Sequence, residues 1–212
     1  AGTLPEFEEQ IDVLFTPDYE RTRIATAPNH LFLVAGASDS GKRLLMEHLT
    51  HFGGGDVVVA KKQTTRQRRS TDGVELESVD TIAGQFDLRY GQHGSEYGIN
   101  TGQIAKDLGQ QRYVFLVVSD DKAVASLRNR FRNSSVIYLH RDVDQTTLDA
   151  YFEREGITDP TEIASRLAKK ERLFQDYRRD PKKYDGVLIN SYGPEGEIAN
   201  QAIQLLFNMR GM

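Results

Sequence analysis

The segment GASDSGKR, residues 36–43, combines glycines, small polar side chains and a lysine at a spacing that binds phosphate. In the pattern G-x-x-x-x-G-K-[ST], the glycines let several backbone N–H groups point at one anion. A helix that starts at this point adds the partial positive charge of its N-terminus. Lys42 would then reach the β- and γ-phosphates of ATP. The alternative is a glycine-rich turn without a ligand. The predicted ATP-binding residues are Gly36, Ala37, Ser38, Asp39, Ser40, Gly41, Lys42 and Arg43.

Arg43 departs from this pattern because it stands where a Ser or Thr hydroxyl should bind Mg²⁺. A guanidinium has no lone pair to offer a metal ion. Either other groups and water hold the metal while Arg43 turns away or contacts phosphate, or the loop binds nucleotide poorly and no longer catalyses. Asp120 and Asp121 are candidate metal ligands, although both also suit the N-cap and first turn of a helix.

A second group of basic residues lies in KKQTTRQRRSTDG, residues 61–73. A charge run of this kind is usually a solvated face. This run, however, follows an apolar segment that reads as a strand, and ligands bind at the carboxyl ends of strands in α/β sheets. Arg66 and Arg69, three positions apart, can hold one phosphate group through paired hydrogen bonds. They are therefore the predicted anchor for a phosphate-bearing acceptor.

Apolar runs alternate along the chain with segments of helical spacing. This alternation predicts crossover connections and a parallel sheet, and the continuous apolar runs indicate strands buried on both faces. The fold class is therefore α/β. The stretch 61–97 does not follow this alternation, and we expect it to be an inserted substrate-binding lobe. The predicted strands are 31–35, 57–60, 113–118, 136–139 and 186–189. The predicted helices are 42–52, 103–108, 122–131, 145–154, 161–177 and 195–209.

In combination, these segments resemble the guanylate kinase superfamily of P-loop kinases. The shared features are the phosphate loop, a T-T-R-x-x-R segment at 64–69, the pair Tyr97-Gly98, a lid-like LDAYFEREGITDPTEIASRL and Asn190 after the last strand. The resemblance implies a P-loop three-layer fold over residues 30–212, after an N-terminal extension 1–29. Within it, 61–99 would be the acceptor-binding lobe and 144–166 the helical lid.

One stretch is similar to a narrower branch of that superfamily, the ribose 1,5-bisphosphate phosphokinases. FDLRYGQHGSEYGIN, residues 86–100, follows their F-x-L-x-W-x-A-H-G-x-x-Y-G-I run. The guanine-reading positions of guanylate kinases are altered, with Asp72 and Glu75 as the nearest acidic residues and Leu76 in place of a tyrosine. The resemblance therefore favours ribose 1,5-bisphosphate as acceptor, with 5-phosphoribosyl diphosphate as product. GMP kinase activity and a catalytically inactive binding module remain the alternatives.

The resemblance also implies roles for individual side chains. Lys42, Arg154 and Arg166 would neutralise charge on the transferring phosphoryl group, and Asn190 would belong to the ATP site. The residues implied in acceptor binding are Arg66, Arg69, Asp72, His93, Tyr97 and Ser119. Three of these side chains have simpler interpretations. Tyr97 could be a packed aromatic, His93 an incidental loop residue, and Arg166 the helical i+4 partner of Glu162.

Composition limits the partners of this 212-residue chain. With 27 basic and 31 acidic residues the net charge is −4, so no nucleic-acid partner is indicated. The absence of cysteine excludes disulfides, thiolate zinc sites and a cysteine nucleophile. No apolar run reaches membrane-spanning length. We therefore expect a cytoplasmic protein that uses ATP and Mg²⁺ on a phosphorylated small molecule, without a membrane partner. Homodimer formation remains open.

Overall fold

The computed structural model describes residues 29–37, 40–69, 72–92, 94–141, 145–154 and 156–190, without the side chains of Gln145, Arg154 and Ile189. Several sequence predictions lie outside this part of the chain. They are the N-terminal extension up to residue 28, the helix 195–209, the residues Ser38, Asp39 and His93, and the side chain of Arg154.

Five parallel strands form the central sheet, in the order β2-β7-β1-β8-β9. Phe32 of β1 pairs in register with Phe115 of β7, and their rings stack with centroids 4.7 Å apart. Four strands match the predicted bounds to within one residue, and β8 extends further at both of its ends. The strands are β1 (Leu31–Ala35), β2 (Val57–Val59), β7 (Tyr113–Val117), β8 (Ser134–His140) and β9 (Gly186–Ile189).

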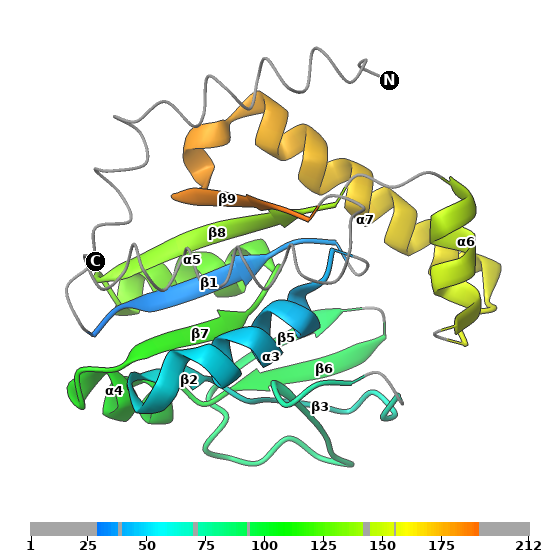
Figure 1. Ribbon diagram of the computed structural model, residues 1–212. Helices are drawn as coiled ribbons and strands as arrows, with labels where there is room; N and C mark the ends of the chain where they lie inside the picture. Colours follow the sequence, from blue (N-terminus) through cyan, green and yellow to red (C-terminus); the bar gives the residue numbers. More distant parts are fainter. Residues whose placement is uncertain are drawn as a thin grey trace.

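Helices cover both faces of this sheet, so the predicted three-layer α/β fold is confirmed (Figure 1). Alternate residues of β1 belong to different cores, because successive side chains of a strand point to opposite faces. Phe32 and Val34 pack with Leu45 and Leu49 of α3, whereas Leu33 packs with residues of α4, α5 and α7. The helices are α3 (Lys42–Gly53), α4 (Thr101–Gly109), α5 (Asp121–Arg130) and α7 (Pro160–Arg179).

The segment predicted as a lobe forms a second, four-stranded sheet of order β4-β3-β6-β5, below the central sheet in Figure 1. Its short strands are rich in polar residues and lack continuous apolar runs, which is why the sequence predicted an insertion without predicting its strands. Asp87 ties this sheet to the core, since it accepts hydrogen bonds from the Thr101 amide at 2.9 Å and from Arg130 at 3.0 Å. The strands are β3 (Lys62–Thr64), β4 (Leu76–Ser78), β5 (Leu88–Gln92) and β6 (Ser95–Ile99).

Helix α6 (Gln145–Arg154) lies at the N-terminal end of α7, away from the central sheet (Figure 1). Its Leu148 and Phe152 form a small core of their own with Ile157. Helix α7 starts at Pro160, and the Asp159 side chain caps it by accepting the Thr161 amide at 2.9 Å. Two short 3₁₀ helices complete the described elements, Gly54–Asp56 and Pro181–Lys183. No helix in the described ranges combines the length and apolarity needed to span a bilayer.

Gly98 of β6 lies where the lobe leaves no room for a side chain. A Cβ atom at Gly98 would lie 2.5 Å from Cγ2 of Ile82 and 2.9 Å from Cβ of Phe86, and both of those side chains are buried. Gly98→Ala should therefore lower the free energy of unfolding by about 1–3 kcal/mol, as overpacking does. Urea denaturation measures this. Gly91→Ala on the neighbouring strand is the control, because its nearest atom would be 4.0 Å away. Equal stability of the two variants would contradict the prediction.

Candidate phosphate-binding site

The loop between β1 and α3 has a glycine near each end. Gly41 precedes the helix with φ of 91°, a left-handed conformation that glycine adopts without steric cost. Gly36 lies so close to β8 that a Cβ atom there would be 2.5 Å from the Leu139 carbonyl oxygen. Among the described residues, no side chain forms a hydrogen-bonded cap on the first turn of α3.

Lys42 folds back over this loop. Its Nζ donates to the Gly36 carbonyl oxygen at 3.0 Å, to the Ala37 carbonyl oxygen and to Ser40 Oγ at 3.3 Å. An ammonium group has three donors and no acceptor, so it seeks oxygen atoms. The loop's own carbonyl oxygens and the Ser40 hydroxyl therefore hold the ammonium group of Lys42.

Arg43 lies away from the loop. Its Nη1 pairs with Glu47 Oε1 at 2.7 Å on the exposed side of α3. A Cβ atom on Gly73 would be 2.8 Å from Arg43 Cγ, so the arginine stem also packs against the loop before β4. The Arg43 side chain is therefore turned away from the loop.

The two candidate metal ligands, Asp120 and Asp121, make contacts at the start of α5. Asp120 is the N-cap of α5 and accepts the Ala123 amide at 2.8 Å. Asp121 is exposed and pairs with Lys183 at 3.2 Å. Among the described residues, no three His, Cys, Asp or Glu side chains are grouped as a metal site.

Two other predicted residues contact the loop directly. Ser119, which follows β7, donates from Oγ to the Gly36 carbonyl oxygen at 3.3 Å. Asn190, which follows β9, donates from Nδ2 to the Ser40 carbonyl oxygen at 3.1 Å. The carboxyl ends of β1, β7 and β9 thus bring the loop, Ser119 and Asn190 together, as expected at this edge of a parallel sheet.

The predicted arginine pair follows β3, and each arginine already holds a carboxylate. Arg66 pairs with Asp72, whose other oxygen accepts the Arg69 amide at 2.8 Å. Burial lowers the pKa of Arg66, but Asp72 and the Tyr97 hydroxyl outweigh it and the pKa is raised overall. Asp72, predicted to bind the acceptor, therefore serves the loop itself in this conformation.

Glu162 of α7 joins Arg69 to Arg166. Its Oε1 accepts from Arg69 Nη2 at 2.7 Å and from Arg166 Nη2 at 2.6 Å, an arrangement that we call the Glu162 bridge. The hydrogen bond from Arg166, only partly opposed by burial, lowers the pKa of Glu162, and Arg69 adds to this. The sequence anticipated the helical pair Glu162–Arg166. It did not anticipate that the lobe shares this carboxylate.

Lys62 is the functional candidate that the sequence analysis did not single out. The residue is 7% exposed, with Nζ 3.5 Å from the Tyr90 hydroxyl and 5.5 Å from the ring centre of Tyr97. The two tyrosine rings stack with centroids 5.3 Å apart. Burial lowers the pKa of Lys62 to about 8; Glu75 opposes this, whereas Lys169 and Arg66 add to it. In the sequence, Lys62 was one of five basic residues, and only the fold shows that it is buried.

A polar cavity of about 310 Å³ lies between the tip of β5, the end of β7 and α7. Burial lowers the pKa of Lys169 to about 8, and the charge of Arg172 contributes to the decrease. The α7 residues on the cavity follow helical spacing, which is the sequence signal that could have identified them. The lining residues are Gln92, Ser119, Asp120, Ser165, Ala168, Lys169 and Arg172.

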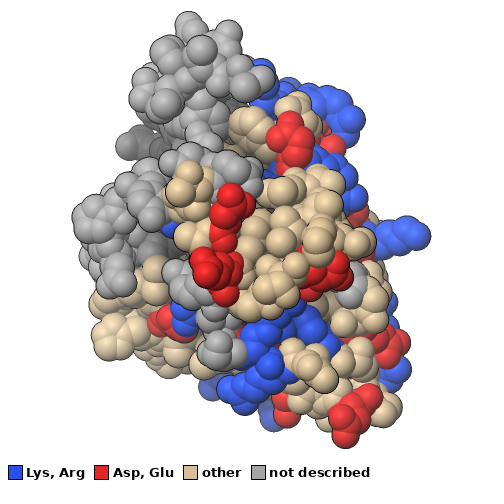
Figure 2. Space-filling view, turned by 90° about the vertical axis from the view of Figure 1, so that its right-hand side faces the viewer, with Lys and Arg blue, Asp and Glu red and all other residues tan. Residues whose placement is uncertain are grey.

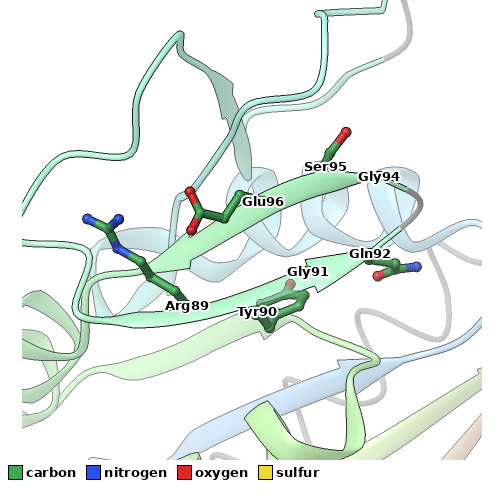
Figure 3. Close-up of a pocket in the computed structure, with 7 residues that line it drawn as sticks. All are labelled: Arg89, Tyr90, Gly91, Gln92, Gly94, Ser95 and Glu96. Atoms are coloured by element: carbon green, nitrogen blue, oxygen red, sulfur yellow. The ribbon is translucent and has the colours of Figure 1, made fainter.

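Figure 2 views the molecule from the side on which α6 and the lobe lie in Figure 1. Basic side chains gather in the lower part of this face, at the height of the lobe. A second hollow of about 550 Å³ lies along the β5–β6 hairpin between Arg89 and Glu96 (Figure 3). Tyr90 and Gln92 point to one side of that hairpin, and Arg89 and Glu96 point to the other.

Comparisons with known proteins support the fold only. No protein-family profile matches the chain, and no curated protein sequence does. Among solved structures, the chain is similar to guanylate kinase from Anaplasma phagocytophilum, with a TM-score of 0.54 and 15% sequence identity. The match covers 86% of this chain and 87% of that chain. The chain therefore has a guanylate kinase-like P-loop fold, as the sequence resemblance led us to expect.

Replacing Lys62 should stabilise the ligand-free protein. The fall in pKa from 10.5 to about 8 means that its charge costs up to about 3 kcal/mol more in the folded than in the unfolded state. Lys62→Met should therefore raise the free energy of unfolding by about 1–3 kcal/mol at pH 7. Wild-type stability should increase between pH 8 and about 10.5, so the advantage of the variant should vanish over that interval.

Urea denaturation at pH 7 and at several higher pH values measures this difference. Lys61→Met is the matched control, because the neighbouring Lys61 is exposed. A Lys62→Met protein that is less stable than wild type at pH 7 would show that the buried ammonium stabilises the lobe.

Removing the Glu162 carboxylate should strengthen phosphate binding at the arginine pair. Glu162→Gln keeps the size of the side chain but leaves Arg69 and Arg166 without their shared anion. The affinity for ribose 5-phosphate should rise about 3- to 10-fold, because one charge-assisted hydrogen bond no longer competes. Isothermal titration calorimetry measures this. Glu171→Gln on the same helix, whose carboxylate bonds Gln175, should change nothing. Weaker binding by Glu162→Gln would mean that the bridge positions the arginines.

Proposed function

We propose that this protein is an ATP-dependent kinase that transfers the γ-phosphoryl group to a phosphate-bearing small molecule. The favoured acceptor is ribose 1,5-bisphosphate, and the product is 5-phosphoribosyl diphosphate. One observation carries the proposal. On a guanylate kinase-like fold, two separate sets of cations hold the chain's own oxygen atoms. Lys42 holds loop carbonyls, while Arg66, Arg69 and Arg166 hold carboxylates.

Carboxylate and carbonyl oxygens are the natural substitutes for phosphate oxygens at such cations. In the proposed reaction, an oxygen of the acceptor's C1 phosphate bonds to the γ-phosphorus of ATP. The bond from that phosphorus to the bridging oxygen breaks, and ADP leaves. Lys42 and the loop amides hold the donor phosphates, and Arg66 and Arg69 anchor the acceptor's other phosphate. Mg²⁺ bound to ATP would add charge neutralisation.

Positioning and electrostatic stabilisation then account for the rate, as is general for phosphoryl transfer. Arg166 lies on α7 beside the acceptor arginines, because it shares Glu162 with Arg69. It is therefore placed to neutralise the transferring group once Glu162 gives way to phosphate. Arg154, at the end of α6, is proposed for the same role. Closure of α6 over the site would exclude water and suppress ATP hydrolysis.

Glu75 keeps GMP as a second candidate acceptor. Its Oε2 is buried and has no hydrogen-bond partner among the described residues. A carboxylate in this state suits a ligand with N–H donors, such as the edge of guanine. Against this stands Leu76, which cannot hydrogen-bond a base.

Arg43 supports the remaining alternative, an inactive binding module. Arg43 stands where the P-loop usually has a hydroxyl for the metal ion. Its side chain pairs with Glu47 and offers no metal ligand. A module of this kind would bind phosphorylated ligands without turnover, so only an activity measurement separates it from a kinase.

The decisive experiment measures ADP formation from Mg-ATP with ribose 1,5-bisphosphate, GMP or dGMP as acceptor. We expect turnover that depends on ribose 1,5-bisphosphate and falls at least about 100-fold in Lys42→Ala, because the donor phosphates lose their cation. Lys122→Ala, an exposed lysine at the start of α5, is the charge-matched control. Turnover with GMP alone would establish the alternative acceptor. Absence of turnover with every acceptor would refute the kinase assignment.

A further inference from the structure

The cavity of about 310 Å³ between the lobe and α7 contains more positive charge than the described residues balance. Arg66, Arg69 and Arg166 have carboxylate partners. Lys169 and Arg172, which line the cavity, form no ion pair within the described part of the chain, and the charge of Arg172 acts on Lys169. Lys62 connects this group to the arginine pair, because the charges of Lys169 and Arg66 both act on it.

Asp120 is the carboxylate on the cavity lining, and its Oδ1 already accepts the Ala123 amide. Asp120 and Asp121 attract Lys169, and Glu75 attracts Lys62, but none of these pairs forms an ion pair within the described residues. The buried Lys62 and the partly buried Lys169, beside the exposed Arg172, are costly with this little compensation unless an anion joins them.

The lining also restricts what else the ligand can contain. Apart from Ala168 it consists of polar side chains, including the amide of Gln92 and the hydroxyls of Ser119 and Ser165. No aromatic ring is among the described residues that line the cavity, and Tyr90, on the neighbouring hairpin, stacks on Tyr97. Tyr90 lies on the same side of the hairpin as Gln92, which does line the cavity (Figure 3). Hydroxyls and amides suit a polyol, whereas a nucleobase requires an aromatic or apolar surface for stacking.

We propose that this cavity is a second anion subsite of the acceptor site, in which Lys169 and Arg172 bind a phosphate group distinct from the one held by Arg66 and Arg69. The ligand is therefore a sugar bisphosphate, and its hydroxyls contact Gln92, Ser119 and Ser165. This inference rests on the proposed function, which identifies this region as the acceptor site. It adds Lys169 as the residue that distinguishes a bisphosphate from a monophosphate. Lys169 is a specificity residue outside the P-loop machinery.

Binding without ATP tests the subsite independently of catalysis. The full chain is titrated by calorimetry with ribose 1,5-bisphosphate, ribose 5-phosphate and GMP. We expect wild type to bind the bisphosphate at least about tenfold more tightly than the monophosphate. Lys169→Met should remove most of that difference while changing the ribose 5-phosphate affinity less than about twofold. Lys169→Arg should preserve it, and the exposed Lys122→Met should behave as wild type.

Ala168→Leu provides a second variant in case Lys169→Met does not fold. Ala168 is an exposed helix position on the lining, so leucine fills the cavity without a change of charge. It should weaken bisphosphate binding selectively.

The subsite is refuted if Lys169→Met weakens both sugar phosphates equally, if it weakens neither, or if GMP binds more tightly than the bisphosphate. Wild type that fails to bind the bisphosphate at millimolar concentration would refute it as well. If Lys169→Met loses only bisphosphate binding and no assay detects ADP formation, the subsite is supported and the kinase assignment is refuted. If the protein forms ADP but Lys169→Met does not change the preference for bisphosphate over monophosphate, the kinase assignment is supported and the subsite is refuted.

Discussion

The structure depends on one electrostatic constraint: several cations lie where little water reaches them, and each needs an oxygen atom. Lys62 is buried, Lys169 is partly buried, and Arg66 and Arg166 are enclosed by the lobe and α7. Such groups destabilise a fold unless carboxylates, carbonyls or a ligand compensate them. Many contacts in the site compensate these cations only in part. Asp72, Glu162 and the loop carbonyls each occupy a place suited to a phosphate oxygen.

The fold creates the constraint by bringing three separate parts of the chain to one edge of the central sheet. The carboxyl ends of β1 and β7 supply the loop and Ser119, the inserted lobe supplies Lys62 and the arginine pair, and α7 supplies Glu162 and Arg166. The Glu162 bridge joins two of these parts, since one carboxylate holds the lobe to α7. In the proposed function, a ligand phosphate would have to compete with Glu162 for Arg69 and Arg166.

Arg43 changes the geometry of the loop between β1 and α3 less than its place in the motif suggests. Its pairing with Glu47 and its packing on Gly73 leave the glycine geometry and Lys42 in the arrangement expected for phosphate binding. Asp120 and Asp121 belong to the start of α5, where a carboxylate suits the helix dipole. The loop thus retains its anion-binding features, whereas the metal-binding feature is absent from its usual position.

The sequence by itself determined the parallel sheet, the bounds of β1, β9 and α6, and the phosphate loop, because continuous apolar runs, helical spacing and glycine positions are local signals. It also predicted an inserted lobe, although not its four short polar strands. Tertiary structure decided which charges matter. Lys62 and Lys61 are adjacent and chemically identical, yet one is buried against Tyr90 and the other is exposed. The partner of Arg69 is 93 residues away in the sequence, and the charge of Lys169 on α7 acts on Lys62 of the lobe. Burial and charge pairing arise from contacts distant in sequence, so no local pattern could predict them.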